Sequence, residues 1–189
     1  IFQTKINTAE VRELFKDAKD ASIEEQNVIR NKLYTKLQET YSILKDYNIK
    51  QLHFHLPDNK SFLRFHKANK FGDDLSNIRA TVKYVNEYKK PVDGFEEGRI
   101  YNGYRFVFPL FYKKEHIGSV EVSFSTLAMN LELLNHFNTI GKFLISKKVV
   151  QNKVFNDELN NYIQSRFEDF LYEKKVDQLI QKNNIKNVQ

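Results

Sequence analysis

The stretch QLHFHLPDNKSFLRFH, residues 51–66, gathers side chains that can bind an anion. Alternate residues of a strand point to opposite faces, so His53 and His55 share one face while the residues between and beside them are apolar. A turn at PDNK would bring Arg64 and His66 back beside them. An arginine fork can hold a carboxylate or a phosphate through two parallel hydrogen bonds, and imidazoles can donate more. We therefore predict a small-anion site, with two ordinary alternatives: a solvated face, or ion pairs with acids such as Glu121, Asp73 and Asp74.

The same histidines offer a second chemistry, metal binding. His53 and His55 are two residues apart on one strand face, His66 lies across the hairpin, and Glu121 could supply a fourth ligand. A four-residue loop would set three residues of the second strand beside the first two histidines: Phe62, Arg64 and His66. The chain contains no cysteine, which excludes thiolate metal sites and disulfides. A zinc site is therefore a further interpretation of this face.

Two more arginines are candidates for ligand contacts. Arg105 follows Asn-Gly on a predicted strand; a four-residue KKEH turn would place it opposite Phe124, whereas a bulge would set it with Ser123 and Glu121. Arg79 follows GDDL and could reach over the sheet as part of a lid. A structural ion pair or a surface position is the ordinary alternative for each.

Catalytic motifs are absent from the sequence. It has no glycine-rich phosphate loop, no HExxH and no nucleophile elbow. Its acid pairs, EE at 96–97 and DD at 73–74, are neighbours along the chain and do not by themselves make a paired-carboxylate site. We predict no enzymatic activity for this chain and no cofactor.

The composition indicates a soluble globular chain rather than a nucleic-acid binder. The chain has 189 residues, 41% of them hydrophobic, and a net charge of +6. Its basic residues alternate with acids, as in EDFLYEKK, instead of forming one stripe. No apolar run approaches the length of a membrane span, and no signal peptide is visible. Because the chain begins with Ile, we expect it to be a piece of a longer protein.

The elements that must position these residues follow from periodicity. Residues 4–46 read as helix, with a break at ASIEE where Ser22 and Glu25 can form a capping box. Unbroken, such a helix would be about 60 Å long, so part of it should project or bind a partner helix. After the hairpin, Asp73 or Asp74 can cap a helix with four apolar residues on one side: Leu75, Ile78, Val82 and Val85.

The second half reads as three strands, a short helix, a strand and a long helix. The strands are expected near 97–101, 104–112 and 117–125, with Asn102-Gly103 as a hairpin turn. Ser125 or Thr126 can cap the short helix. KFLISKKVV, residues 142–150, reads as a strand, and Asn156 can cap a long final helix. Two strands, a helix and three strands is the order of a PAS-type sheet, in which the first strand lies beside the fifth.

Two segments resemble the periplasmic double Cache sensor domains of bacterial histidine kinases, chemoreceptors and cyclic-dinucleotide enzymes. These segments, within residues 48–125, are LHFHLPDNKSFLRFHKANKFGDDLSNIR and GFEEGRIYNGYRFVFPLFYKKEHIGSVEVSFS. The resemblance implies a membrane-anchored receptor that holds a small ligand between its sheet and the loops above it. Two features depart from the family pattern. The chain after residue 126 is short for a full second lobe, and Ser123 stands where many amino-acid-binding members carry Asp.

We therefore predict an α+β fold: a PAS-like, antiparallel five-stranded sheet with long N- and C-terminal helices and at most a reduced second Cache lobe. The expected parts are a stalk helix (1–47), a ligand-binding lobe (48–126) and a membrane-proximal segment (127–189). The expected function is extracytoplasmic sensing of a small molecule, most simply a carboxylate, by an inner-membrane receptor that dimerises through its helices. The alternatives are a helix-mediated interaction module without a small ligand, and a zinc sensor. The predicted ligand-binding residues are His53, His55, Arg64, His66, Arg79, Arg105 and Ser123.

Overall fold

The computed structural model describes residues 2–98 and 102–184, and the chain divides into two compact units. Unit 1 comprises Ile1–Gly94 and Arg105–Ser123, and unit 2 comprises Phe95–Tyr104 and Phe124–Gln189. Each unit has its own apolar cluster and is described by itself.

A five-stranded sheet in the order β2-β1-β5-β4-β3 is the central element of the larger unit. The first strand therefore lies beside the fifth, and the predicted α+β class with a PAS-like strand order is confirmed. Alternation builds it: Leu52 and Phe54 point into the apolar core, while Gln51 and His53 point to the other face. The strands are β1 (Ile49–His55), β2 (Ser61–Arg64), β3 (Val92–Glu96), β4 (Gly103–Tyr112) and β5 (Glu115–Phe124).

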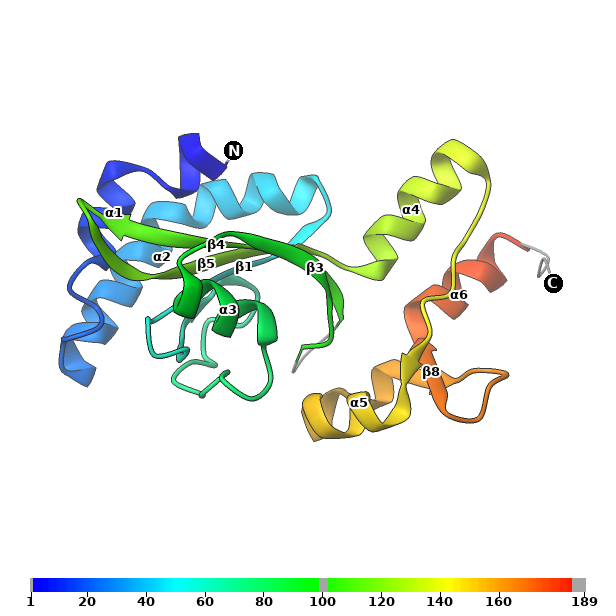
Figure 1. Cartoon of the computed structure of the whole chain (residues 1–189). Helices are drawn as coiled ribbons and strands as arrows, with labels where there is room; N and C mark the ends of the chain where they lie inside the picture. The colour runs from blue at the N-terminus through cyan, green and yellow to red at the C-terminus, as the bar shows by residue number, and fades with distance from the viewer. Residues whose placement is uncertain (1, 99–101, 185–189) are drawn as a thin grey trace. The chain divides into compact units, whose positions relative to one another are not determined.

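Helices cover one face of this sheet (Figure 1). They are the short turn η1 (Phe2–Ile6), α1 (Ala9–Phe15) and α2 (Ile23–Asp46). The predicted capping box starts α2: the Ser22 hydroxyl accepts from the Glu25 amide at 3.3 Å, and the Glu25 carboxylate accepts from the Ser22 amide at 2.8 Å. The predicted break before Ser22 and the predicted long N-terminal helix are confirmed, since α2 has 24 residues. The expectation that part of this helix projects is wrong, because α2 packs along the sheet.

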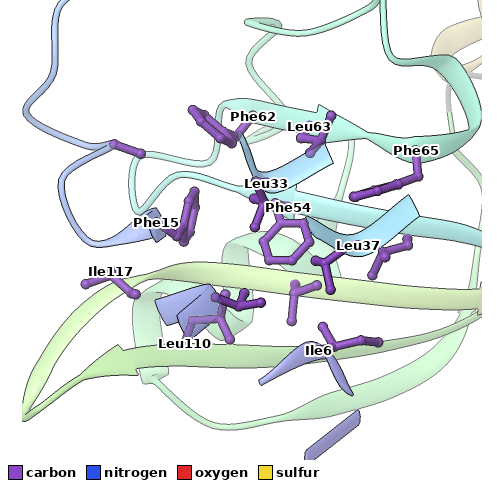
Figure 2. Packing of buried hydrophobic residues seen from close by; sticks show 14 of the residues in the cluster. Ile6, Phe15, Leu33, Leu37, Phe54, Phe62, Leu63, Phe65, Leu110 and Ile117 are labelled. Atoms are coloured by element: carbon purple, nitrogen blue, oxygen red, sulfur yellow. The ribbon is translucent and has the colours of Figure 1, made fainter. Parts of the chain in front are cut away.

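The core between these helices and the sheet is rich in phenylalanine (Figure 2). The ring of Phe15 in α1 lies 5.6 Å from that of Phe54 and 5.1 Å from that of Phe62, measured between centroids. Leu33 and Leu37 from α2 complete the contact. These two leucines are therefore core residues and do not form a free seam for a partner helix.

The β1–β2 hairpin departs from the expected register. His53 pairs with Arg64 as predicted, but an irregularity between Phe54 and His55 sets His55 opposite Ser61. Phe62 consequently points into the apolar core, where we had expected it beside the histidines. A one-residue shift reverses the face of every side chain that follows, which explains the error.

The opposite face of the sheet is covered by η2 (Phe65–Lys67), a loop and α3 (Ala80–Tyr88) (Figure 1). The predicted helix start at Asp73 or Asp74 is wrong, because α3 begins only after Arg79. The backbone before it bonds to the hairpin instead. The Ser61 amide donates to the Asp73 carbonyl at 3.0 Å, and the Leu75 amide donates to that of Asn59 at 3.1 Å.

Two strand expectations also need correction. The strand preceding β4 lies at Val92–Glu96 rather than at 97–101, and residues 99–101 lie outside the described part of the chain. Gly103 begins β4, so Asn102-Gly103 is not the tight turn of a two-residue hairpin. The turn between β4 and β5 consists of Lys113 and Lys114, two residues instead of four.

Unit 2 contains a short helix and a three-stranded sheet in the order β6-β8-β7. Ser125 caps α4, as predicted, by accepting from the Ala128 amide at 3.1 Å. The strand expected at 142–150 is present only at Ile145–Ser146, and a helix begins at Lys147. The expected long C-terminal helix is wrong, because a turn and two strands precede a short helix. The elements are α4 (Thr126–Phe137), β6 (Ile145–Ser146), α5 (Lys147–Lys153), η3 (Asn156–Asn161), β7 (Tyr162–Gln164), β8 (Phe170–Glu173) and α6 (Lys174–Lys182).

Candidate functional site

Polar side chains line the sheet face that α3 covers, and we call them the polar face. Each is 4% exposed or less, so the interpretation of this surface as a solvated one is wrong. They come from four strands, β1, β2, β4 and β5, and from Arg79, the residue that precedes α3. The members of the polar face are Gln51, His53, His55, Ser61, Arg64, Arg79, Arg105, Ser119, Glu121 and Ser123. His66, the remaining predicted ligand residue, is partly buried at the edge of this set.

Glu121 in β5 is the centre of the polar face. Its Oε2 accepts from Nη2 of Arg79, and its Oε1 accepts from Nη1 of Arg105. Burial by itself would raise the pKa of the Glu121 carboxyl, but the two guanidiniums and His55 lower it to about 2. The Glu121 carboxylate is therefore ionised, and it is buried in contact with two arginine side chains.

Arg105 lies with Glu121 and Ser123, which is the arrangement we had expected from a bulge. Its Nη1 also donates to Oε1 of Gln51, and the Ser123 hydroxyl donates to the same oxygen at 2.9 Å. The regular alternation of side chains along β5 is interrupted at Gly118, where φ is +136°. Ile117 and Val120 are both core residues although they are three positions apart, whereas residues on one face of a regular strand are two or four positions apart.

Arg64 is engaged by an acid. Its Nη1 and Nη2 donate to the two carboxylate oxygens of Asp73 at 2.7 and 2.9 Å, and Nη1 also donates to the Lys70 carbonyl at 2.7 Å. This bidentate pair ties β2 to the loop that precedes α3. For Arg64 the structure thus shows the ion pair that we had considered as the alternative to ligand binding.

The three histidines around Glu121 have low proton affinity. His53 Nε2 lies 2.8 Å from the Ser61 hydroxyl, and His55 Nδ1 lies 3.1 Å from the Ser119 hydroxyl. Burial lowers the pKa of His53 well below its usual value, and it lowers the pKa values of His55 and His66 to about 3. All three imidazoles are therefore neutral near pH 7. The two serines were missed in the sequence; Ser119 carries a signal, since SVEVS alternates polar residues on one strand face.

The polar face can perform two kinds of chemistry. Arg79 and Arg105 are placed to hold a carboxylate, as Glu121 itself shows. Three of the acceptor side chains, His53, His55 and Glu121, also have possible ligand atoms that all lie within 4.8 Å of one another. His66 is not part of that group among the described residues.

A family described as the double sensory domain of two-component sensor kinases matches residues 6–181. No curated protein sequence matches the chain. Within the part of the chain that the structure describes, no helix has the length and apolar character of a membrane span.

The comparison with solved structures found partial likenesses to sensory and ligand-binding domains. The ligand-binding domain of the Campylobacter jejuni chemoreceptor Tlp3, in complex with 4-methylisoleucine, is 15% identical with a TM-score of 0.41, covering 78% of this chain and 60% of that one. An extracellular ligand-binding receptor from Desulfohalobium retbaense is 14% identical with a TM-score of 0.48, covering 72% and 27%. The sensor domain of the V. cholerae histidine kinase DctB is 13% identical with a TM-score of 0.38, covering 68% and 52%.

The chain spans between 49% and 60% of the length of three solved domains that it matches. The family assignment rests on the match over residues 6–181, which is most of the chain, and not on these structural likenesses. That family is sensory and not itself catalytic. The chain therefore belongs to the double Cache family of sensory domains, described as those of two-component sensor kinases.

Proposed function

We propose that this chain is the extracytoplasmic sensory domain of a membrane-anchored receptor and that it binds a small carboxylate on the polar face. Membership of the double sensory family supports the sensing role. The periplasmic location, the membrane anchor and the ligand class are parts of the proposal. The receptor's output lies outside this chain.

The single observation that carries the ligand class is the pair of guanidiniums on one buried carboxylate. Arg79 and Arg105 each contact a different oxygen of Glu121, and none of the three side chains is exposed to solvent. A ligand carboxylate can replace the Glu121 carboxylate at these two guanidiniums, because it presents the same two oxygens. Arg79 is also the residue that precedes α3, so this exchange changes how α3 is held on the sheet.

The other predicted ligand residues receive narrower roles. Arg64 is occupied by Asp73, so it holds the loop over the face rather than reaching a ligand. Neutral His53, His55 and His66 can donate hydrogen bonds from one ring nitrogen and accept at the other. Ser123 positions Gln51 beside Arg105. Contacts of these residues with a ligand remain predictions.

Thermal unfolding tests the proposal. The chain is screened in EDTA against mono- and dicarboxylates, amino acids and phosphate. A ligand at about 100 times its Kd should add about 2.7 kcal/mol, or roughly 5–10 °C for a chain of this size. Arg79→Gln should remove that shift, whereas Arg166→Gln, at an exposed position in unit 2, should preserve it. Stabilisation that survives Arg79→Gln, or no stabilisation by any carboxylate, would show the proposal to be wrong.

Dimerisation in the full receptor is a second part of the proposal, and exposed apolar side chains on α2 support it. Ile23 is 73% exposed, Val28 53% and Ile43 47%. Because the chain has no cysteine, single cysteines can be introduced without background. We expect Val28→Cys or Ile43→Cys to form disulfide dimers in membranes, while Leu37→Cys, in the core, should not. Equal cross-linking at all three positions would contradict a specific α2 interface.

A further inference from the structure

We propose that His53, His55 and Glu121 form a binding site for a divalent transition metal, with Zn²⁺ as the best fit. The proposal goes beyond carboxylate sensing and does not depend on it, although both use the polar face.

Geometry is the first support. The possible ligand atoms of the three side chains all lie within 4.8 Å of one another, and His55 Nε2 is 3.9 Å from Glu121 Oε2. Zinc ligands sit roughly 2.0–2.2 Å from the metal, so a modest inward movement of these side chains would bring all three into its coordination sphere. The rings of His53 and His55 already lie close together, with centroids 4.1 Å apart.

The hydrogen bonding of the two rings is the second support. His53 Nδ1 and His55 Nε2 are buried, and neither has a hydrogen-bond partner within the described part of the chain. The other nitrogen of each ring lies against a serine hydroxyl, that of Ser61 or Ser119. This is the arrangement of a metal-binding histidine, in which one nitrogen faces the metal and a polar group orients the ring through the other. A buried nitrogen without a partner is otherwise costly.

The ligand set selects the class of metal. Two imidazoles and one carboxylate suit Zn²⁺, Co²⁺ or Ni²⁺, whereas Ca²⁺ and Mg²⁺ prefer an all-oxygen shell. Three protein ligands leave a fourth position for water or for an anion.

Arg79 competes with the metal. Its Nη2 donates to Oε2 of Glu121, the oxygen that lies near His55. A metal bound to this oxygen must displace the guanidinium, since both need the same lone pairs and carry the same sign of charge. Arg79→Gln should therefore tighten metal binding while it weakens carboxylate binding. These opposite signs separate the metal inference from the proposed function.

Metal titration of the purified, EDTA-treated and dialysed chain tests the inference. We expect one Co²⁺ per chain with the intense visible bands of a tetrahedral site, and displacement of Co²⁺ by Zn²⁺. His53→Gln and His55→Gln should each weaken Zn²⁺ binding by more than the roughly 10–100-fold that loss of an outer-shell partner costs, because each removes a direct ligand. His136→Gln is the matched control, because His136 lies exposed on α4 beside Glu132 and should leave the affinity unchanged.

Three results would overturn the inference: no Co²⁺ bands, Zn²⁺ binding that is lost in His136→Gln, or Zn²⁺ binding unaffected by both site variants. Glu121→Gln leaves two buried guanidiniums without their shared carboxylate and is at risk of not folding. The two histidine variants carry the test, each with its folding checked by circular dichroism. Carboxylate binding in EDTA is measured separately, so failure of the metal site leaves that result intact.

Discussion

At the residue scale, the buried charges of the polar face are stabilised by ion pairs, because a charge that is removed from water needs a partner. Glu121 remains ionised because Arg79 and Arg105 hold it, and Arg64 has its own acid in Asp73. The histidines avoid a buried charge altogether, because they are buried in the neutral form. In the function proposed above, a ligand carboxylate would exchange with Glu121 at these two guanidiniums.

Acid should destabilise the domain through these histidines. The folded pKa of His55 is about 3, below the value of about 6.5 expected when unfolded, because burial and the facing arginines 64, 79 and 105 outweigh the attraction of Glu121. Between those values the unfolded chain binds more protons, so stability is full above about pH 6.5 and falls by about 1.4 kcal/mol per pH unit for each such histidine.

Urea unfolding between about pH 8 and about pH 4 measures this slope. His55→Gln should make the dependence of the unfolding free energy on pH shallower, by the contribution of about one bound proton. A free energy of unfolding that stays constant over this range would contradict the neutral, buried state of the histidines.

Gly118 is a residue that backbone geometry requires. Its φ of +136° disfavours other residues, and a Cβ there would lie 2.3 Å from the His55 carbonyl oxygen and 2.9 Å from Cε1 of Phe15. Gly118→Ala should cost at least ~3 kcal/mol in the free energy of unfolding. Gly72 is the control: its φ is +85° but a Cβ would meet nothing within 4 Å, so Gly72→Ala should cost only about 1–2 kcal/mol. Equal losses would show that crowding at Gly118 is relieved by movement.

At the scale of elements, α2 is a packed helix with one buried and one exposed side. Leu37 is 1% exposed and belongs to the core cluster, whereas Val28 is 53% exposed. The same helix therefore supports the sheet and exposes an apolar surface, at which we propose dimerisation. Any change in how α2 packs on the sheet would be felt at that surface, which is how a ligand signal could leave the domain.

Truncations along α2 should separate these two sides. Leu37→Ala should lower the free energy of unfolding by about 2–5 kcal/mol, because it leaves a cavity against the sheet. Val28→Ala should change it by no more than about 0.5 kcal/mol. Urea denaturation of both variants provides the comparison. If the two losses were alike, α2 would not pack on the sheet through the side that contains Leu37.

At the scale of the whole molecule, the division into two units places the candidate site in one of them. All members of the polar face lie within Ile1–Gly94 or Arg105–Ser123. Unit 2 has a separate apolar cluster around Ile145, Val150, Val154 and Tyr162. The side chains proposed to hold a ligand or a metal therefore all belong to unit 1.

A fragment of residues 1–125 should consequently fold and bind as the full chain does. We expect cooperative thermal unfolding and a Kd for Zn²⁺ or the carboxylate within about threefold of the full-chain value, measured by calorimetry. A fragment that ends at residue 112 is the control, because it lacks β5 and with it Glu121. Loss of binding by the 1–125 fragment despite native circular dichroism would show that unit 2 contributes to the site.

The sequence by itself determined the elements whose signals are local. Alternation in β1 placed His53 and His55 on one face, Ser22 with Glu25 marked the start of α2, and Ser125 marked that of α4. The order of strands and helices was sufficient to predict the PAS-like sheet and, with the two quoted segments, the sensor family. These signals depend on side-chain periodicity and on caps, which act over a few residues.

Only the tertiary structure decided the register, the partners of the charges and the fold of the C-terminal part. One extra residue at the Phe54–His55 step sent Phe62 into the core, and the irregularity at Gly118 brought Arg105 to Glu121. Asp73 was recruited by Arg64 instead of capping a helix. In unit 2, short apolar runs fitted both periods, and pairing of β8 between β6 and β7 made strands where spacing indicated a helix. The physical reason is the same throughout: contacts between distant segments outweigh local preferences of well under 1 kcal/mol per residue.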